Sequence, residues 1–327
     1  MRVPGYLQWL SARPDGAEWL KQLPALVAAC ADQWELTLSA PFEDGGQVSY
    51  VAPATTPDGT PVVLKVQWPH READHEAEAL RRWGGDGAVR LLAHDPDRYA
   101  LLLEQARPGI RLAASPPELA VGVIIGLVPR LSVPVTEPFT TLADEAAIWG
   151  GELPRKWEQA GRPFEPELVD RALGLLRELA PTQGPSVLLH QDLHSDNVLA
   201  ALREPWLAID PKPLAGEVEF AVAPLCRDYT LGHSPSAVRH RLDRFCGELG
   251  LDRERARGWA FAQTVAWAFD ENKAIVRHGE VAHRLTEIVR LDHRVRRWRR
   301  SSTCGASGPP CSATSTAERP TPAASRS

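Results

Sequence analysis

Three polar side chains have the types and the spacing that phosphoryl transfer to a hydroxyl group requires. Asp192 and Asn197 lie within residues 190–197 (HQDLHSDN), and Asp210 ends the apolar run that begins at Trp206. A carboxylate such as Asp192 can accept the proton of an attacking hydroxyl. The side-chain oxygens of Asn197 and Asp210 can bind the magnesium ions that bridge nucleotide phosphates. The sequence therefore predicts a kinase that uses ATP and Mg²⁺, with Asp192 as the catalytic base and Asn197 and Asp210 as the metal ligands.

The same segment allows a second interpretation. His190, Asp192 and His194 stand at alternate positions and could bind one metal ion in a metallohydrolase. Such an enzyme needs further ligands, but the other histidines form no pair at a spacing of two or four residues. Asn197 and Asp210 would also have no role in it. The kinase interpretation is therefore favoured, and His194 is more simply a loop histidine.

A kinase also needs a lysine on a strand of a smaller, upstream lobe. Residues 61–67 (PVVLKVQ) alternate in the manner of a half-buried strand, and residues 47–54 are expected to be its hairpin partner. Lys65 on this strand would contact the nucleotide phosphates. An apolar stripe predicts a helix over residues 71–83, and Glu76 on it would orient Lys65 through an ion pair.

Two further segments are candidates for nucleotide binding. Gly45 and Gly46 precede a strand and could form a turn over the phosphates, although a glycine pair is more often an ordinary hairpin turn. Residues 88–93 and 98–104 are predicted strands. The backbone of the residues that follow, Glu104, Gln105 and Ala106, would form the hinge between two lobes and contact the adenine edge.

The second half of the chain should be mostly helical. Apolar residues keep helical spacing over 169–179 and again over 257–273. Asp270 and Glu271, near the end of the second helix, are candidates for holding cationic groups of a substrate. A solvated helix end explains them equally well.

Composition narrows the class of protein. The chain has 327 residues, 43% hydrophobic content, five cysteines and a net charge of −5. These values, with no 18-residue apolar run and no secretory leader, predict a cytoplasmic enzyme. Its thiols should be reduced. We expect no membrane, no nucleic acid and no obligate protein among its partners. The negative charge suits a cationic small molecule. Residues 293–300 carry five arginines, more often a solvated helix end than a lipid or nucleic-acid site, and residues 301–327 should be disordered.

Four stretches together resemble the aminoglycoside/hydroxyurea antibiotic resistance kinase family, and within it the streptomycin 6-kinases. The first is the strand that carries Lys65, together with the helix and loop that follow it and close with residues 80–92 (LRRWGGDGAVRLL). The other three are residues 141–145 (TLADE), the segment 190–197, and residues 203–214 (REPWLAIDPKPL). The resemblance spans roughly residues 17–290. It implies an α+β, two-lobed, protein-kinase-like fold with a small β-rich N-lobe and a mostly helical C-lobe. It also implies ATP-dependent phosphorylation of an aminoglycoside antibiotic, with the 6-position of streptidine in streptomycin as the expected acceptor.

The resemblance also implies a domain layout. We expect an N-terminal helical segment over residues 1–36, a nucleotide-binding N-lobe over 37–106 with the hinge at its end, a helical C-lobe over 107–300, and the tail over 301–327.

One departure from the family pattern concerns residue 221. The family usually has aspartate there, to accept hydrogen bonds from the catalytic-loop backbone, whereas this chain has Ala221. Ser195 and Asp196 also replace the Pro-Gly that relatives often carry. The alternative hypothesis is therefore a kinase-shaped, nucleotide-binding protein with weak or no turnover.

Overall fold

The structure is a computed structural model that describes residues 3–43, 45–135, 137–270 and 273–287. These residues form one compact unit that ends at Glu287. The predictions for residues 293–300 and 301–327 fall outside the described residues.

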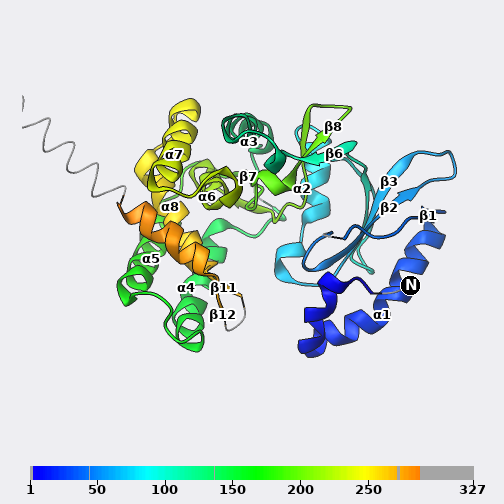
Figure 1. Cartoon of the computed structure of the whole chain (residues 1–327), viewed down its shortest axis with the longest axis horizontal. Helices are drawn as coiled ribbons and strands as arrows, with labels where there is room; N and C mark the ends of the chain where they lie inside the picture. Colours follow the sequence, from blue (N-terminus) through cyan, green and yellow to red (C-terminus); the bar gives the residue numbers. More distant parts are fainter. Residues whose placement is uncertain (1–2, 44, 136, 271–272, 288–327) are drawn as a thin grey trace, which may run out of the picture. The chain divides into compact units, whose positions relative to one another are not determined.

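The first half of the chain builds a five-stranded antiparallel sheet with the strand order β1-β2-β3-β5-β4. Its strands β1, β2 and β3 are labelled in Figure 1. The predicted hairpin is confirmed, because Lys65 on β3 pairs with Val51 on β2 and with Leu101 on β5. The predicted strands over 88–93 and 98–104 are also present, each beginning two or three residues later than expected. The bounds are β1 (Thr37–Leu38), β2 (Ser49–Thr55), β3 (Pro61–Gln67), β4 (Leu91–Asp95) and β5 (Ala100–Glu104).

An N-terminal 3-10 helix, η1 (Gly5–Ala12), and the helix α1 (Pro14–Gln33) precede the sheet. Buried apolar side chains of α1 form one core with buried residues of β2 and β3, so the N-terminal segment is packed on the sheet. The members from α1 are Trp19, Leu23, Val27 and Cys30, and those from the sheet include Tyr50, Ala52, Leu64 and Val66.

The helix predicted over residues 71–83 is shorter than expected. Residues Arg71–Ala73 form a 3-10 turn, His75 has a left-handed backbone (φ 67°), and α2 runs only from Glu76 to Trp83. A left-handed residue interrupts the α-helical hydrogen-bond ladder, so the helix restarts after His75. Glu76 is consequently the first residue of α2 and lies at the end nearest to β3.

The second half of the chain is mostly helical, with short two- and three-stranded sheets around the loops that carry polar residues. The helices are α3 (Pro117–Leu131), α4 (Leu142–Gln159), α5 (Pro166–Leu179), α6 (Val222–Arg227), α7 (Pro235–Leu249) and α8 (Arg253–Ala266), with residues 276–287 also helical. The strands are β6 (Pro108–Arg111), β7 (Val187–Leu189), β8 (Val198–Ala201), β9 (Trp206–Ala208), β10 (Leu214–Gly216), β11 (Phe269–Asp270) and β12 (Lys273–Ala274).

The core of this lobe is centred on α8, which packs on α5, α6 and α7. The prediction of a helix over 257–273 was wrong at both ends. α8 begins at Arg253, where Asp252 caps it by accepting a hydrogen bond from the Arg255 amide, and it ends at Ala266. The segment predicted as its last turn is the hairpin β11–β12.

No helix within the described ranges is long and apolar enough to cross a membrane. Cys30, Cys226 and Cys246 are buried free thiols.

Candidate active site

Lys65 and Glu76 form the ion pair that the sequence predicted. The Lys65 Nζ lies 2.8 Å and 2.7 Å from the two carboxylate oxygens of Glu76, and it also lies 2.6 Å from Oδ1 of Asp210. Gln67 donates a further hydrogen bond to Glu76, at 2.6 Å. Burial alone would lower the pKa of Lys65, but Asp210 and Glu76 outweigh burial and raise it. The ammonium therefore stays charged and can bind phosphate oxygens.

Asp192 lies on a tight loop between β7 and the 3-10 turn η5 (Ser195–Asn197). The side-chain amide nitrogen of Asn197 donates to the Asp192 carbonyl at 3.0 Å, which closes the loop. Gln191, immediately before Asp192, has a left-handed backbone (φ 64°). Such conformations cost on the order of 1 kcal/mol or more and persist where the surroundings enforce them, commonly at functional sites.

His190 joins this loop to the strand that leads to Asp210. Its Nε2 donates to the carbonyl of Ile209 at 3.0 Å, and its ring stacks on Trp83 with centroids 6.0 Å apart. Burial lowers the pKa of His190 to about 4, so the imidazole is neutral near pH 7. Asp210, the next residue after Ile209, has a left-handed backbone (φ 56°). His190 is therefore a positioning residue, and the structure gives it no role as a metal ligand.

The two carboxylate oxygens of Asp192 have different surroundings. Oδ2 accepts a hydrogen bond from Lys212 at 2.7 Å, whereas Oδ1 faces His194 Nε2 at 3.7 Å and Arg227 Nη2 at 4.0 Å. Burial would raise the pKa of Asp192, but Lys212, His194 and Arg227 outweigh burial and hold it well below its usual range. Asp192 is thus an ionised carboxylate with one oxygen that accepts no hydrogen bond from the described residues.

Lys212 and Arg227 did not emerge from the motif analysis. Lys212 follows Asp210 by two residues and could have been noticed as a cation beside the metal strand. Arg227 ends α6, far from any motif, and only the fold brings it to Asp192.

Asn197 and Asp210 fit a magnesium site of the kind that is completed by phosphates. The amide oxygen of Asn197 accepts no hydrogen bond from the described residues, and the Asp210 side chain is 45% exposed. Within the described ranges no three acidic, cysteine or histidine residues are grouped to bind a metal on their own. Mg²⁺ commonly takes one or two protein oxygens together with phosphates and water, which is what these two residues offer.

The residues predicted to form the hinge stand at the end of β5. The backbone amide and the side chain of Glu104 already form hydrogen bonds within the protein. The amide donates to the Arg90 carbonyl at 2.9 Å, and the carboxylate accepts hydrogen bonds from Arg203 at 2.8 Å and 2.9 Å. Gln105 and Ala106, which follow, have no hydrogen bond to any other described residue. Their backbone groups are therefore the ones available to an adenine edge.

Gly45 and Gly46 lie in the loop between β1 and β2, as expected for a loop that covers phosphates. Gly46 has φ 131°, and a Cβ on Gly45 would lie 2.9 Å from the Tyr6 hydroxyl. Glycine is favoured at position 46 by its backbone angle, and a side chain at position 45 would require the Tyr6 hydroxyl to shift.

The structure describes only one of the two residues that were predicted to hold cationic groups of a substrate. Asp270 is in strand β11 and not at a helix end, and Glu271 lies outside the described residues. The preceding Trp267 contacts the catalytic centre, since the Lys212 Nζ lies 5.2 Å and the Arg227 Cζ lies 4.6 Å from its ring centroid.

The catalytic loop is held without an aspartate at position 221. Asp228, just after α6, accepts a hydrogen bond from the Ser195 amide at 2.8 Å and another from the Thr230 amide at 3.0 Å. The Ser195 hydroxyl is 2.7 Å from the Thr230 hydroxyl. Asp228 therefore supplies at least one hydrogen-bond acceptor for the loop backbone, a role that Ala221 has no side-chain oxygen to fill.

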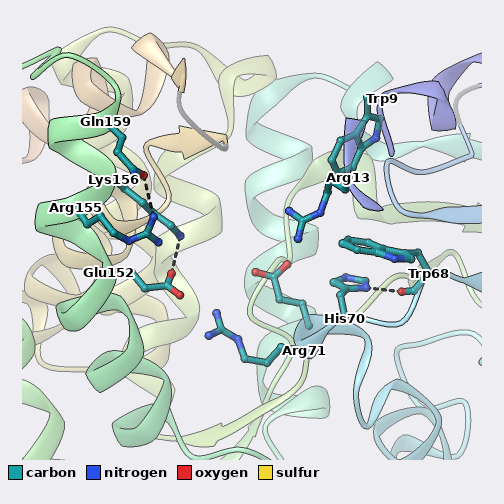
Figure 2. Close-up of a pocket in the computed structure, with 10 residues that line it drawn as sticks. Trp9, Arg13, Trp68, His70, Arg71, Glu152, Arg155, Lys156 and Gln159 are labelled. Atoms are coloured by element: carbon teal, nitrogen blue, oxygen red, sulfur yellow. Dashed lines mark hydrogen bonds and ion pairs between the residues drawn. The ribbon is translucent and has the colours of Figure 1, made fainter. Parts of the chain in front are cut away.

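A cavity of about 680 Å³ lies between the loop after β3 and helix α4 (Figure 2). Figure 2 shows side chains of α4 on one wall and those of the N-terminal segment and the loop after β3 on the other. Its Glu72 is 4.0 Å from Lys212, which bonds Asp192, so the cavity lies close to Asp192. The lining residues are Trp9, Arg13, Trp68, His70, Arg71, Glu72, Glu152, Arg155, Lys156 and Gln159.

The sequence matches the aminoglycoside/hydroxyurea antibiotic resistance kinase family over residues 34–273. The chain belongs to this family. It is 38% identical over 283 residues to a streptomycin 6-kinase of Streptomyces griseus, covering 83% of this chain and 91% of the relative. It is also 38% identical over 295 residues to a hydroxyurea phosphotransferase of Kitasatospora aureofaciens, covering 86% of this chain and 84% of the relative.

Among solved structures, the choline kinase LicA of Streptococcus pneumoniae aligns with a TM-score of 0.58 at 13% identity, covering 81% of this chain and 99% of LicA. This likeness confirms the two-lobed, protein-kinase-like fold of this antibiotic resistance kinase. The resemblance predicted from the motifs is thereby confirmed as well.

Proposed function

We propose that this kinase transfers the γ-phosphoryl group of ATP to a hydroxyl of streptomycin, at the 6-position of the streptidine ring, and so confers resistance. The observation that carries the proposal is that Lys65, from a distant part of the sequence, meets Asp210 in the segment that also carries Asp192 and Asn197. Its support is the 38% identity to a streptomycin 6-kinase over most of both chains.

Each residue has a role that its contacts support. Lys65, held by Glu76, would bind phosphate oxygens of ATP, and Gln105 and Ala106 would contact the adenine edge. Asn197 and Asp210 would hold Mg²⁺, which when bound neutralises charge on the phosphates. Asp192 would accept the proton of the acceptor hydroxyl at Oδ1, the oxygen that Lys212 does not occupy.

The cavity beside Glu72 is the candidate acceptor site. Its volume of about 680 Å³ lies in the range of small-molecule sites, and Trp9 and Trp68 offer apolar surface for a sugar ring. Its wall is not acidic overall, although the net charge of the chain suggested a site for cations. We infer that the carboxylates of Glu72 and Glu152 meet the guanidinium groups of streptomycin, and that Glu152 exchanges its ion pair with Lys156 for one with the substrate.

The decisive experiment measures phosphorylation of streptomycin directly. The purified chain with ATP and Mg²⁺ should release ADP only when streptomycin is added, and NMR of the product should place the phosphate on the 6-hydroxyl. The Asp192→Asn variant is the matched control for contaminating kinases. Equal ADP release with and without streptomycin would refute the proposal.

Hydroxyurea is a second candidate acceptor because a hydroxyurea phosphotransferase is equally similar to this chain. It is small and uncharged, so it would not need Glu152. Running both acceptors in the same assay decides between them.

We also propose that the enzyme acts in the cytoplasm, where ATP is available. The three described cysteines are free thiols, which agrees with a reducing compartment.

A further inference from the structure

We propose that Lys212 and Arg227 form an anion-binding clamp beside Asp192 that holds the phosphoryl group while it is transferred. The clamp rests on the proposed phosphotransferase function. It adds two residues, outside the predicted set of nucleotide, metal and base residues, that would touch the reacting group directly.

The first observation is an excess of positive charge around Asp192. Lys212 and Arg227 both face this one carboxylate, and the nearest other acid to Lys212 is Glu72 at 4.0 Å. Asp210 is already bonded to Lys65. Buried cations are costly unless an anion matches them. Two cations thus converge on the single carboxylate of Asp192, so a phosphoryl group that arrives beside Asp192 would meet both of them.

The second observation concerns the Arg227 side chain itself. Arg227 is only 7% exposed, and its Nη1 is buried with no hydrogen-bond partner among the described residues. Its Nη2 is 4.0 Å from Asp192, beyond hydrogen-bond distance. Holding Asp192 in place thus does not account for Arg227. A guanidinium group presents a planar fork of donors that matches phosphate oxygens.

Trp267 keeps both cations near one aromatic ring. The Arg227 guanidinium carbon is 4.6 Å from the ring centroid, and the Lys212 Nζ is 5.2 Å from it. Contacts with the ring help to hold cations that would otherwise repel each other. Fixed contacts of this kind orient the two cations, as efficient stabilisation of a developing charge requires.

The chemical step is balanced without any further reactant. The acceptor oxygen forms a bond to the γ-phosphorus, the bond from that phosphorus to the β–γ bridging oxygen breaks, and ADP leaves with the bond's electron pair. The hydroxyl proton goes to Oδ1 of Asp192. Lys212 and Arg227 donate hydrogen bonds to the phosphoryl oxygens and form no covalent bond.

The test compares binding of ADP with binding of ADP plus fluoroaluminate, which mimics a phosphoryl group in flight. Calorimetry with Mg²⁺ but no acceptor should show that the wild-type chain binds ADP more tightly when fluoroaluminate is present. Lys212→Met and Arg227→Met should each reduce that gain by roughly tenfold or more. Their affinity for ADP alone should stay within about twofold of wild type, because neither side chain forms a hydrogen bond or a close ion pair with the proposed ADP-binding residues.

Arg257 provides a matched control. Like Arg227 it is 7% exposed and has a buried Nη1 without a partner among the described residues, but it pairs with Glu254 in α8. Arg257→Met should therefore leave the fluoroaluminate gain unchanged. If a melting curve shows that Arg227→Met does not fold, Lys212→Met and Arg227→Lys replace it in the test. A lysine at position 227 keeps the positive charge but lacks the planar pair of donors of a guanidinium group.

Three results would overturn the clamp: no fluoroaluminate gain in the wild-type chain, a full gain in Lys212→Met and in the folded Arg227 variant, or an equal loss in Arg257→Met. None of these measurements contains streptomycin. A chain that shows the clamp signature but does not phosphorylate streptomycin would therefore refute the proposed acceptor and leave the clamp standing.

Discussion

The ammonium of Lys65 lies 2.6 Å from the carboxylate of Asp210, a residue 145 positions further along the chain. This contact joins strand β3 of the sheet to the segment that follows β9 in the helical lobe. The same ammonium bonds both oxygens of Glu76. The lysine expected to bind phosphate and the expected metal ligand are thus in direct contact.

The buried ion pair gives a first prediction, on stability. Lys65→Met should abolish activity and also destabilise the protein by about 3–5 kcal/mol, because Glu76 is left buried without its partner. In the double variant Lys65→Met, Glu76→Leu, both charges are gone and most of the stability should return while activity does not. Urea unfolding combined with the ADP-release assay checks both effects. A double variant as unstable as the single one would show that the pair is not the cause.

Removal of the catalytic base gives a second prediction. Asp192→Asn should lower kcat by roughly 10²–10⁴-fold, because asparagine cannot take the hydroxyl proton. The affinity for ADP with Mg²⁺ should remain nearly unchanged, since Asp192 faces the acceptor and its cations and not the proposed nucleotide ligands. Steady-state kinetics and calorimetry measure the two quantities separately. Retained turnover in this variant would move the base to another residue.

A third prediction concerns pH. Burial lowers the pKa of His190 and of His278 to about 4. The usual value of about 6.5 applies in the unfolded chain. Between these values the unfolded state binds more protons, so the free energy of unfolding should fall as the pH drops from about 6.5 to 4, by up to about 1.4 kcal/mol per pH unit for each histidine.

Replacing one of these histidines checks the pH effect. His278→Gln should flatten the decline in denaturant-unfolding experiments between pH 6.5 and 4.5. His283 is more exposed, with a side chain 46% accessible, and its replacement by glutamine serves as the control. An equal change of slope in both variants would argue against burial as the cause.

The acceptor cavity gives a fourth prediction. Glu152→Gln should raise the KM for streptomycin by roughly tenfold, because a carboxylate that meets a guanidinium group contributes about 1.4 kcal/mol or more. The KM for ATP should not change. Glu158 lies on the same helix but does not line the cavity, so Glu158→Gln is the matched control. An unchanged KM in Glu152→Gln would place the acceptor elsewhere.

The sequence was sufficient for the parts of the site that depend on local pattern. The alternating strand around Lys65, the loop around Asp192 and the apolar run before Asp210 each carry their own signal, and the structure brings all three together. Glu76 was identified because a stripe of apolar residues showed which side of its helix would be buried. These features needed no knowledge of distant contacts.

What the sequence could not supply depends on long-range packing. Arg227 reaches Asp192 from the end of α6, which packs on α7 and α8, and no periodicity in the sequence records that contact. The helix predicted over 257–273 is present but ends at Ala266, because the apolar residues continue as far as Phe269 in strand β11 and burial alone does not separate helix from strand. The sequence also did not predict that Arg203, 99 residues away, donates a hydrogen bond to the Glu104 carboxylate, because this contact too depends on long-range packing.

The last prediction addresses Ala221 and the alternative of a decayed enzyme. If an aspartate at this position were needed to hold the catalytic loop, Ala221→Asp should raise turnover. Asp228 already accepts a hydrogen bond from the Ser195 amide, and Ala221 is buried, so a carboxylate there would be an unmatched interior charge. We therefore expect Ala221→Asp to lower the melting temperature with no gain in kcat.

Asp228→Ala is the companion variant that decides the matter. It leaves the buried Ser195 amide without its acceptor, which costs about 1–3 kcal/mol and should loosen the loop that carries Asp192, so kcat should fall while ADP affinity holds. Melting curves with Mg²⁺ and ADP, together with turnover, separate the two variants. If Ala221→Asp were instead faster than wild type and Asp228→Ala were unaffected, the loop would be poorly anchored in this chain. That result would favour the weakened-enzyme hypothesis, against which the hydrogen bond between Asp228 and Ser195 now argues.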